Sequence, residues 1–249
     1  MNISVIIITY NSEEKIEKCL SSIKDFSDDI IVVDSFSKDS TVDICKKYTN
    51  KVYVNEWKGY AEQKNIAISK AKHEWILWLD SDEELTDIGK KEIKHAVNNY
   101  AGCVGFKLLR RTKFLDKWMD HCWSNDYVLR LFKNQENIYF PDIPLHEELH
   151  IQGEIKQLKG YSINHYPYKD LNEYFSKFMK YSEIFAEYNV DKNKKVGLIK
   201  LLSAFPVTFI KLYIFKKGFL DGIQGFILVF LSSAHNFVKY SRLWEKRKK

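Results

Sequence analysis

The sequence predicts an α/β fold: a Rossmann-like, mostly parallel sheet with flanking helices, followed by a helical C-terminal extension. Two observations support this class. Short β-branched runs alternate with amphipathic segments through the first hundred residues, an order typical of parallel sheets covered by helices. The region after residue 170 reads as helical to the end. With 45% hydrophobic and 29% charged residues, the 249-residue chain can bury a substantial core.

The first half alternates strands and helices in order. The run "ISVIIIT" over 3–9 is β-branched and too short for a helix, so it predicts a buried strand. The segment 13–24 predicts a helix because its apolar residues share one face. The same reasoning predicts further strands at 29–34, 51–55 and 74–80, and helices at 40–48, 60–71 and 86–98.

The second half is less regular. Strand-like runs occur at 103–111, 127–134, 137–140 and 154–166. We therefore expect one α/β domain over 1–168, with halves 1–100 and 101–168, and a helical extension over 169–249. The four cysteines are scattered and form no CxxC pair, which favours reduced thiols in a cytosolic protein over disulfides or structural zinc. A secretory signal is not expected, because the N-terminus lacks a basic segment and a cleavage site.

Polar residues follow three of the predicted parallel strands. Thr9, Tyr10 and Asn11 follow the first, Asp34 ends the second, and Asp80-Ser81-Asp82 follows the fourth. Ligands of open parallel sheets bind beyond the carboxyl ends of the strands, so we expect these residues to share one site. Neither GxGxxG nor GxxxxGK[ST] is present. Phosphates bound there would need another source of positive charge.

Asp80 and Asp82 suggest that this source is a divalent cation. In an extended segment, residues i and i+2 point the same way, and two carboxylates held close together repel unless a cation lies between them. Mg²⁺ and Mn²⁺ suit such oxygen ligands and often bridge them to substrate phosphates. The alternative is that these acids stabilise the start of the helix near Thr86. We expect Glu83 and Glu84 to do only that.

Several motifs, taken together, resemble the GT-A domain of family 2 glycosyltransferases. They are "SVIIITYNSEEKIEKCLSSI", "DIIVVDSFSKDST" and "WILWLDSDEEL", in that order. The intervening "EWKGYAEQKNIAISKA" is similar to bacterial β-glucosyltransferases of the lipopolysaccharide inner core. The similarity extends to "LHEEL", "INHYPY" and "KGFLDGIQGF" downstream. It implies that 1–100 binds a nucleotide sugar and that 101–168 binds the acceptor.

The resemblance also implies roles for the strand-end residues. Thr9, Tyr10 and Asn11 would line the nucleoside pocket, and Asp34 would accept a hydrogen bond from uracil. Asp80-Ser81-Asp82 matches the DxD motif, with Asp82 the more direct metal ligand and Asp80 nearer the ribose and diphosphate.

Other residues of the implied site come from later segments. Gln63, Lys64 and Asn65 occupy the place of a basic residue near the phosphates, although a solvated helix lysine is an equal alternative for Lys64. Arg130 contacts an anion or pairs with a neighbouring acid. In "LHEELH" over 145–150 we expect the catalytic base, Glu147 or else Glu148. His146 and His165 are both candidate contacts of the metal or diphosphate; for His165 we favour a structural hydrogen bond.

The same segment fits HExxH, the signature of zinc peptidases, in residues 146–150. That chemistry needs a helix that places both histidines on one face, and a third ligand. No long amphipathic pattern surrounds the motif, and this hypothesis leaves the first half unexplained. A nucleotidyltransferase is a further alternative, but it would show a glycine-rich loop where this chain has "TYNSEE".

The C-terminal region is apolar and basic. Residues 191–249 contain 13 Lys and Arg against three acids. The longest uninterrupted apolar run, "GFILVFL", is short of the ~20 residues that a spanning helix needs. We therefore expect helices that lie on an anionic membrane surface, although a bundle packed on the catalytic domain is possible. No nucleic-acid recognition module accompanies the charge.

These observations predict a metal-assisted, inverting glycosyltransferase that uses a UDP-sugar, with UDP-glucose as the expected donor. Its expected acceptor is a lipopolysaccharide or lipooligosaccharide core, a glycolipid. Another glycan, such as capsule or a protein-linked sugar, is the alternative acceptor. The expected location is cytoplasmic, peripheral on the inner face of the membrane.

Overall fold

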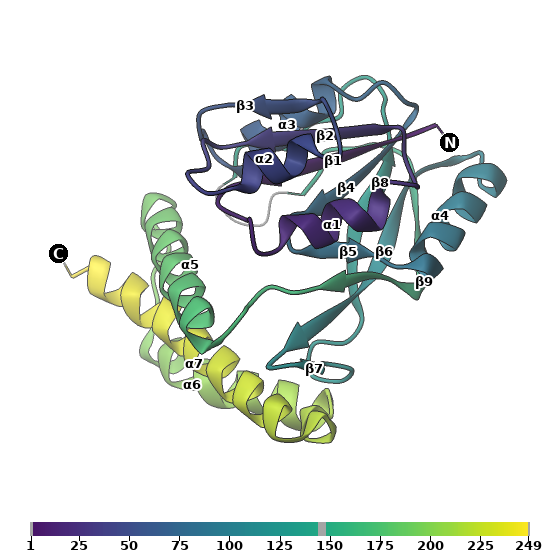
Figure 1. The fold of residues 1–249 in the computed structure, drawn as a ribbon. Coiled ribbons are helices and arrows are strands. Elements are labelled where there is room, and N and C mark those ends of the chain that lie inside the picture. The colour runs from purple at the N-terminus through teal and green to yellow at the C-terminus, as the bar shows by residue number, and fades with distance from the viewer. Residues whose placement is uncertain (1, 144–147, 249) are drawn as a thin grey trace. The chain divides into compact units, whose positions relative to one another are not determined.

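The structure is a computed structural model that describes residues 2–143 and 148–248 (Figure 1). The chain forms two compact units. The first, here called the sheet unit, comprises residues up to Arg110 together with Asn125–Tyr166. The second, here called the helical unit, comprises Arg111–Ser124 and the chain from Pro167 onward. His146 and Glu147 lie outside the described residues.

The parallel part of the sheet confirms the predicted fold class. It contains the strands β1 (Ile3–Thr9), β2 (Asp29–Asp34), β3 (Val52–Val54) and β4 (Trp75–Asp80), in the order β3-β2-β1-β4. Thr9 pairs with Asp34 across β1 and β2, and Ile8 pairs with Asp80 across β1 and β4. The carboxyl ends of these three strands therefore lie next to one another.

Helices cover both faces of this sheet, as the alternation of side chains along β1 requires. Ile3, Val5 and Ile7 belong to a core cluster that includes the buried face of α1 (Ile16–Ile23) and part of α4 (Asp87–Asn99). Ile6 and Ile8 point to the other face and pack in a cluster with α3 (Tyr60–Ser69). The remaining short helix of the sheet unit is α2 (Thr41–Lys46).

Antiparallel strands extend the sheet beyond β4. They are β8 (Asp126–Lys133), β6 (Cys103–Phe114), β9 (Glu154–His165) and β5 (Glu83–Leu85), in the order β4-β8-β6-β9-β5. The prediction of a strand at 137–140 was wrong, because Tyr139 forms only an isolated bridge with His150. The prediction that Glu83 and Glu84 stabilise the next helix was also wrong: both lie in β5, and Thr86 caps α4 by accepting from Gly89 N at 3.0 Å.

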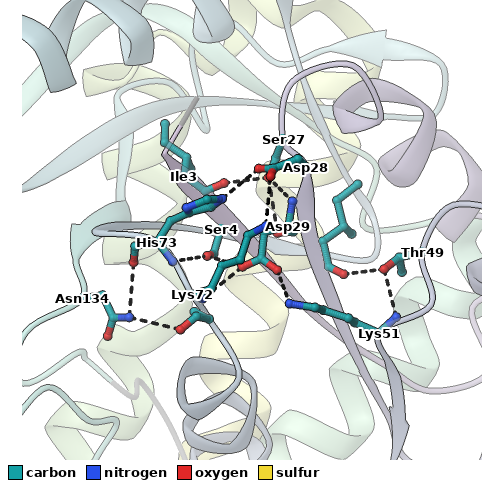
Figure 2. A network of polar contacts seen from close by, with 12 residues as sticks. Ile3, Ser4, Ser27, Asp28, Asp29, Thr49, Lys51, Lys72, His73 and Asn134 are labelled. Atoms are coloured by element: carbon teal, nitrogen blue, oxygen red, sulfur yellow. Dashed lines mark hydrogen bonds and ion pairs between the residues drawn. The ribbon is translucent and has the colours of Figure 1, made fainter.

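A polar network holds together the amino ends of the parallel strands, opposite the carboxyl ends (Figure 2). Its centre is the buried carboxylate of Asp29, the first residue of β2. It accepts from Ser4 Oγ at 2.5 Å, from Lys51 Nζ at 2.5 Å and from Lys72 N at 3.1 Å. Burial alone would raise the pKa of Asp29, but the bonds from Lys51 and Ser4 outweigh it and lower the pKa.

The helical unit contains α5 (Leu171–Asp191), α6 (Leu198–Ile210), the π-helix η1 (Lys211–Phe215), the 3₁₀-helix η2 (Gly218–Asp221) and α7 (Gly222–Lys246). A hairpin formed by the end of β6 and β7 (Lys117–Trp118) belongs to this unit. Asp221 is buried and joins the hairpin to η2, because it accepts from Cys122 N at 2.8 Å and pairs with His121 Nδ1 at 2.8 Å.

Large apolar side chains are exposed on this unit. Ile199 is 86% exposed on α6, Phe215 is 78% exposed on η1, and Ile223 is 65% exposed on α7. Within the described residues, Leu198–Phe215 and Gly218–Lys246 are long and apolar enough to cross a membrane, judged by length and composition alone. Of the 18-residue apolar stretch in each segment, 6% is buried in the first and 33% in the second.

Candidate active site

Hydrogen bonds connect the loops that follow β1, β2 and β4. Asn11 N donates to Ser37 Oγ at 2.8 Å, and Lys38 N donates to Asn11 Oδ1 at 2.9 Å. The hydroxyls of Ser12 and Ser81 lie 3.1 Å apart. Asn11 and Ser81 were both predicted site residues, and the structure places their loops side by side. The rim at the carboxyl ends of the strands is thus one connected surface.

Thr9 and Asp34 are buried at the ends of β1 and β2, whereas Tyr10 is 53% exposed. Asp34 accepts from Ser37 N at 2.8 Å and from Ser37 Oγ at 2.5 Å. An ionised carboxylate has about four acceptor sites, so Asp34 can still accept from a ligand. The hydroxyls of Thr9 and Ser35 are buried with no hydrogen-bond partner among the described residues. Such groups mark places where a ligand or water would bind.

The two aspartates at the end of β4 have different partners. The Asp80 side chain is 34% exposed and forms an ion pair with Arg130. The Asp82 side chain is 17% exposed, and its Oδ1 lies 3.6 Å from His165 Nε2. His165 comes from β9, where it pairs with Glu83 of β5, and Tyr166 N donates to Asp82 O at 2.9 Å. The sequence favoured a structural hydrogen bond for His165 but gave no partner for it, because the β5–β9 pairing is what brings it to Asp82.

Glu83 holds the centre of a buried charge cluster. Its side chain is fully buried, and Oε1 accepts from Arg130 at 2.6 Å and from Arg110 at 2.8 Å. Its Oε2 accepts from Asp80 N at 3.0 Å. Burial would raise the pKa of Glu83, but the charges of Arg130 and Arg110 outweigh this and lower it. Of the two roles considered for Arg130, pairing with neighbouring acids is the one present here.

Two cations lie against the Trp78 ring. The guanidinium carbon of Arg130 is 3.8 Å from the ring centroid, and Lys64 Nζ is 4.0 Å from it. Lys64 is only 3% exposed and also lies 4.8 Å from the Phe140 ring centroid. The alternative that Lys64 is a solvated helix lysine is therefore wrong. Contacts of this kind, when desolvated, contribute about 2 kcal/mol each.

The neighbours of Lys64 on α3 hold adjoining segments in place. Gln63 is buried and donates to Glu56 O at 2.7 Å. Asn65 donates to Phe140 O at 2.9 Å and accepts from Phe140 N at 2.8 Å, so it fixes the backbone just before the 141–148 segment. Both side chains thus hold backbone segments that adjoin α3.

The "LHEELH" segment is described only from Glu148 onward. Glu148 is exposed. His150 forms a β-bridge with Tyr139, and the two rings lie 4.9 Å apart. His150 is therefore not on a helix, which the HExxH zinc site requires. This contradicts the zinc peptidase hypothesis.

The donor chemistry at Asp80 and Asp82 fits Mg²⁺ or Mn²⁺. Both side chains offer hard carboxylate oxygens at the rim where β4 ends. Within residues 2–143 and 148–248, no group of three or more His, Cys, Asp and Glu side chains is arranged to hold a metal ion. Carboxylates of this kind are the oxygen ligands that Mg²⁺ prefers, and it commonly takes one or two of them together with substrate phosphates and water.

Comparison with known proteins identifies the family. The model of the family described as glycosyl transferase family 2 matches residues 4–161. The chain belongs to this family. The match covers β1 to β4 and most of β9, and hence the strand-end rim described above.

Individual relatives align over nearly the whole chain. An uncharacterised glycosyltransferase of Rickettsia typhi is 28% identical over 98% of this chain and 87% of its own length. The lipopolysaccharide core biosynthesis glycosyltransferase LpsC of Rhizobium meliloti is 25% identical over 98% of this chain and 92% of its own. In fold, the chain is similar to S. aureus TarS 1–349 solved with UDP-GlcNAc, with a TM-score of 0.53 and 17% identity over 100% and 92% of the two chains.

Proposed function

We propose that this glycosyltransferase moves a hexose, namely glucose, from a UDP-sugar to a lipopolysaccharide or lipooligosaccharide core acceptor, with inversion at the anomeric carbon. The observation that carries the proposal is the pair Asp80 and Asp82 at the end of β4, on the same strand-end rim as the buried Asp34 of β2, with β1 between the two strands. The likeness to LpsC, whose name places it in lipopolysaccharide core biosynthesis, supports the acceptor. The UDP-GlcNAc complex of TarS supports a UDP-sugar donor.

In this proposal Asp82 and Asp80, with His146, would hold Mg²⁺ or Mn²⁺, which would offset the charge of the departing diphosphate when bound. Arg130 keeps the Asp80 carboxylate in place through their ion pair. Glu83 in turn fixes Arg130 at 2.6 Å and the Asp80 backbone N–H at 3.0 Å. Positioning of this kind matters because small displacements of reacting groups cost large factors in rate.

The remaining donor contacts follow the strand ends and α3. Asp34 accepts a hydrogen bond from the uracil N–H with the acceptor sites that Ser37 leaves open. The other proposed donor-binding residues are Thr9, Tyr10, Asn11, Gln63, Lys64, Asn65 and Ser81. Lys64 acts as a point charge for the diphosphate, and its cation–π contact with Trp78 holds the ammonium group in place.

The acceptor hydroxyl needs a base. We propose Glu147, with Glu148 as the alternative, to take the proton as the hydroxyl oxygen bonds to the anomeric carbon and the bond to the diphosphate breaks. Glu148 is exposed, so it is open to an incoming acceptor. Asn65 supports this role indirectly, because its two hydrogen bonds hold the backbone of Phe140, which precedes the "LHEELH" segment in the chain.

The helical unit brings the enzyme to its acceptor by lying on the cytoplasmic face of the membrane. Ile199, Phe215 and Ile223 are exposed and would enter the bilayer surface. The net charge of residues 191–249, +10, would attract anionic headgroups. Burial of exposed apolar side chains and charge attraction act together in such contacts, which is why we propose a peripheral location.

A donor panel tests the proposal. Purified full-length enzyme is incubated with UDP-glucose, UDP-galactose, UDP-GlcNAc and GDP-mannose, with Mn²⁺ or with chelator, and release of nucleoside diphosphate is measured. We expect turnover of UDP-glucose that chelator abolishes and that Asp82→Asn lowers at least 100-fold. Asp87→Asn is the matched control, since the Asp87 side chain is 88% exposed on α4 and pairs with Lys90 one turn away. Equal activity of Asp82→Asn and Asp87→Asn would refute the proposed metal role.

A further inference from the structure

The helical unit contains a cavity that the transfer chemistry does not use. Its volume is about 230 Å³. Here called the aromatic pocket, it is lined by Trp123, Tyr168, Tyr174, Phe178, Tyr181, Ser232 and His235. The lining residues come from Arg111–Ser124, from α5 and the residues just before it, and from α7. All of these segments belong to the helical unit.

The rings of the pocket form an aromatic wall. The centroids of Tyr168 and Tyr174 are 4.8 Å apart, and those of Phe178 and His235 are 4.6 Å apart. Tyr174 and Phe178 are buried, whereas Tyr181 is 37% exposed. The wall therefore runs from a buried floor to a residue that solvent can reach. This suits a small ligand that enters from water.

Two buried polar atoms belong to the pocket lining, Ser232 Oγ and His235 Nε2. His235 Nε2 is buried, and no group among the described residues forms a hydrogen bond with it. Burial, with a contribution from Lys239, lowers the pKa of His235 to about 4, so the ring is neutral at pH 7. A buried ring nitrogen without a partner is uncommon, because its desolvation is not repaid by a hydrogen bond. A ligand hydroxyl would supply that bond.

The geometry of α7 indicates which kind of ligand enters. At about 100° per residue, Ser232 and His235 lie on the side of α7 opposite to Ile223 and Phe230. Ile223 and Phe230 are 65% and 46% exposed, and Ile223 is one of the residues that we propose enter the bilayer surface. The pocket then opens on the water side of the helix, where a headgroup sugar lies and an acyl chain does not.

We propose that the aromatic pocket binds one sugar ring of the acceptor glycan. A pyranose has an apolar C–H face that packs on flat aromatic rings, and a rim of hydroxyls for His235. The volume is below the 300–1,000 Å³ typical of pockets for larger ligands, which suits a single ring. The inference rests on the proposed function in one respect, that the acceptor is a membrane-anchored glycan.

The test uses full-length protein and methyl glycopyranosides of glucose, galactose, mannose and heptose. Saturation-transfer NMR detects binding, for which we expect dissociation constants on the order of 1 mM, as is usual for one small ring. Tyr181→Ala and His235→Ala should each reduce the transfer at least fivefold for the sugar that binds best. Tyr188→Ala is the matched control, a tyrosine on the same helix outside the lining. Thermal melting checks that each variant is folded.

Several outcomes would overturn the proposal: no saturation transfer to any glycoside, equal transfer in Tyr181→Ala and Tyr188→Ala, or binding of a dodecyl chain that glycosides do not displace. A kinetic readout separates this proposal from the proposed function. Tyr181→Ala should raise the KM for the acceptor at least fivefold and leave hydrolysis of the donor sugar unchanged. If wild-type protein turns over no donor but still binds glycosides at Tyr181 and His235, the proposed transfer fails and the sugar pocket stands.

Discussion

Replacement of Glu83 by Gln should destabilise the protein strongly, although the two side chains have almost the same shape. The Glu83 carboxylate is fully buried between Arg130 at 2.6 Å and Arg110 at 2.8 Å. Removing one partner of a buried ion pair costs about 3–5 kcal/mol. Arg130 keeps Asp80 and Arg110 keeps Asp126, so we expect a loss near the lower end, about 3 kcal/mol. For a chain of this size that corresponds to a Tm lower by ~6–12 °C.

Urea unfolding followed by tryptophan fluorescence measures this loss, and differential scanning calorimetry measures Tm. Glu84→Gln is the control on the same strand, because the Glu84 side chain is 28% exposed and accepts from Tyr166 Oη at 2.7 Å. We expect it to cost no more than about 1 kcal/mol. A Tm for Glu83→Gln within ~2 °C of wild type would show that the cluster around Arg130 does not depend on the carboxylate, and would refute the reasoning.

Three further predictions concern other parts of the chain. The pKa of Asp29 is lowered in the folded protein, so its contribution to stability is present above its unfolded pKa of ~3.9 and is lost as pH falls through the folded pKa. The difference in unfolding free energy between wild type and Asp29→Asn, measured by urea unfolding, should therefore be constant above pH ~5. It should shrink in more acidic buffer. Gly89→Ala would place Cβ 2.4 Å from a backbone oxygen of β9 and should lower the unfolding free energy by about 1–3 kcal/mol. Gly102→Ala has open space around it, so its unfolding free energy should stay within ~0.5 kcal/mol of wild type. Equal unfolding free energies for the two variants would contradict the packing argument. The double variant Ile199→Glu, Phe215→Glu should reduce flotation with anionic phosphatidylglycerol vesicles at least ~10-fold, because each exposed side chain contributes about 1.5–3 kcal/mol when it is buried in lipid. Unchanged flotation would argue against binding of the helical unit to a membrane surface.

The parallel half of the fold could be predicted from sequence because its signals are local. The run 3–9 forms β1 over the predicted residues, and the apolar face of α1 is buried as its spacing indicated. By contrast, β5 is only three residues long, and nothing local distinguishes its glutamates from helix-start acids. Its strand character depends on pairing with β9, which is about 80 residues away in the sequence.

The candidate site divides in the same way. Asp34, Asp80 and Asp82 could be located because strand ends are visible in the sequence. The burial of Lys64 could not, because α3 has no apolar stripe: its buried face comprises Ala61, Gln63, Lys64, Ala67 and Ile68. Its environment is made by Trp78 of β4 and Phe140 from a distant segment. The grouping of 111–124 with the C-terminal helices is likewise a consequence of tertiary packing alone.

The ion pair between Arg130 and Asp80 has a consequence for how the enzyme is handled. Many proteins that collect carboxylates for a divalent ion unfold in EDTA, since the acids then repel one another without relief. Here the Arg130 guanidinium already pairs with Asp80, so relief of the repulsion between Asp80 and Asp82 does not depend on an added ion alone. We expect the protein to withstand purification and storage in chelator without loss of structure, and to regain turnover as soon as Mn²⁺ is returned.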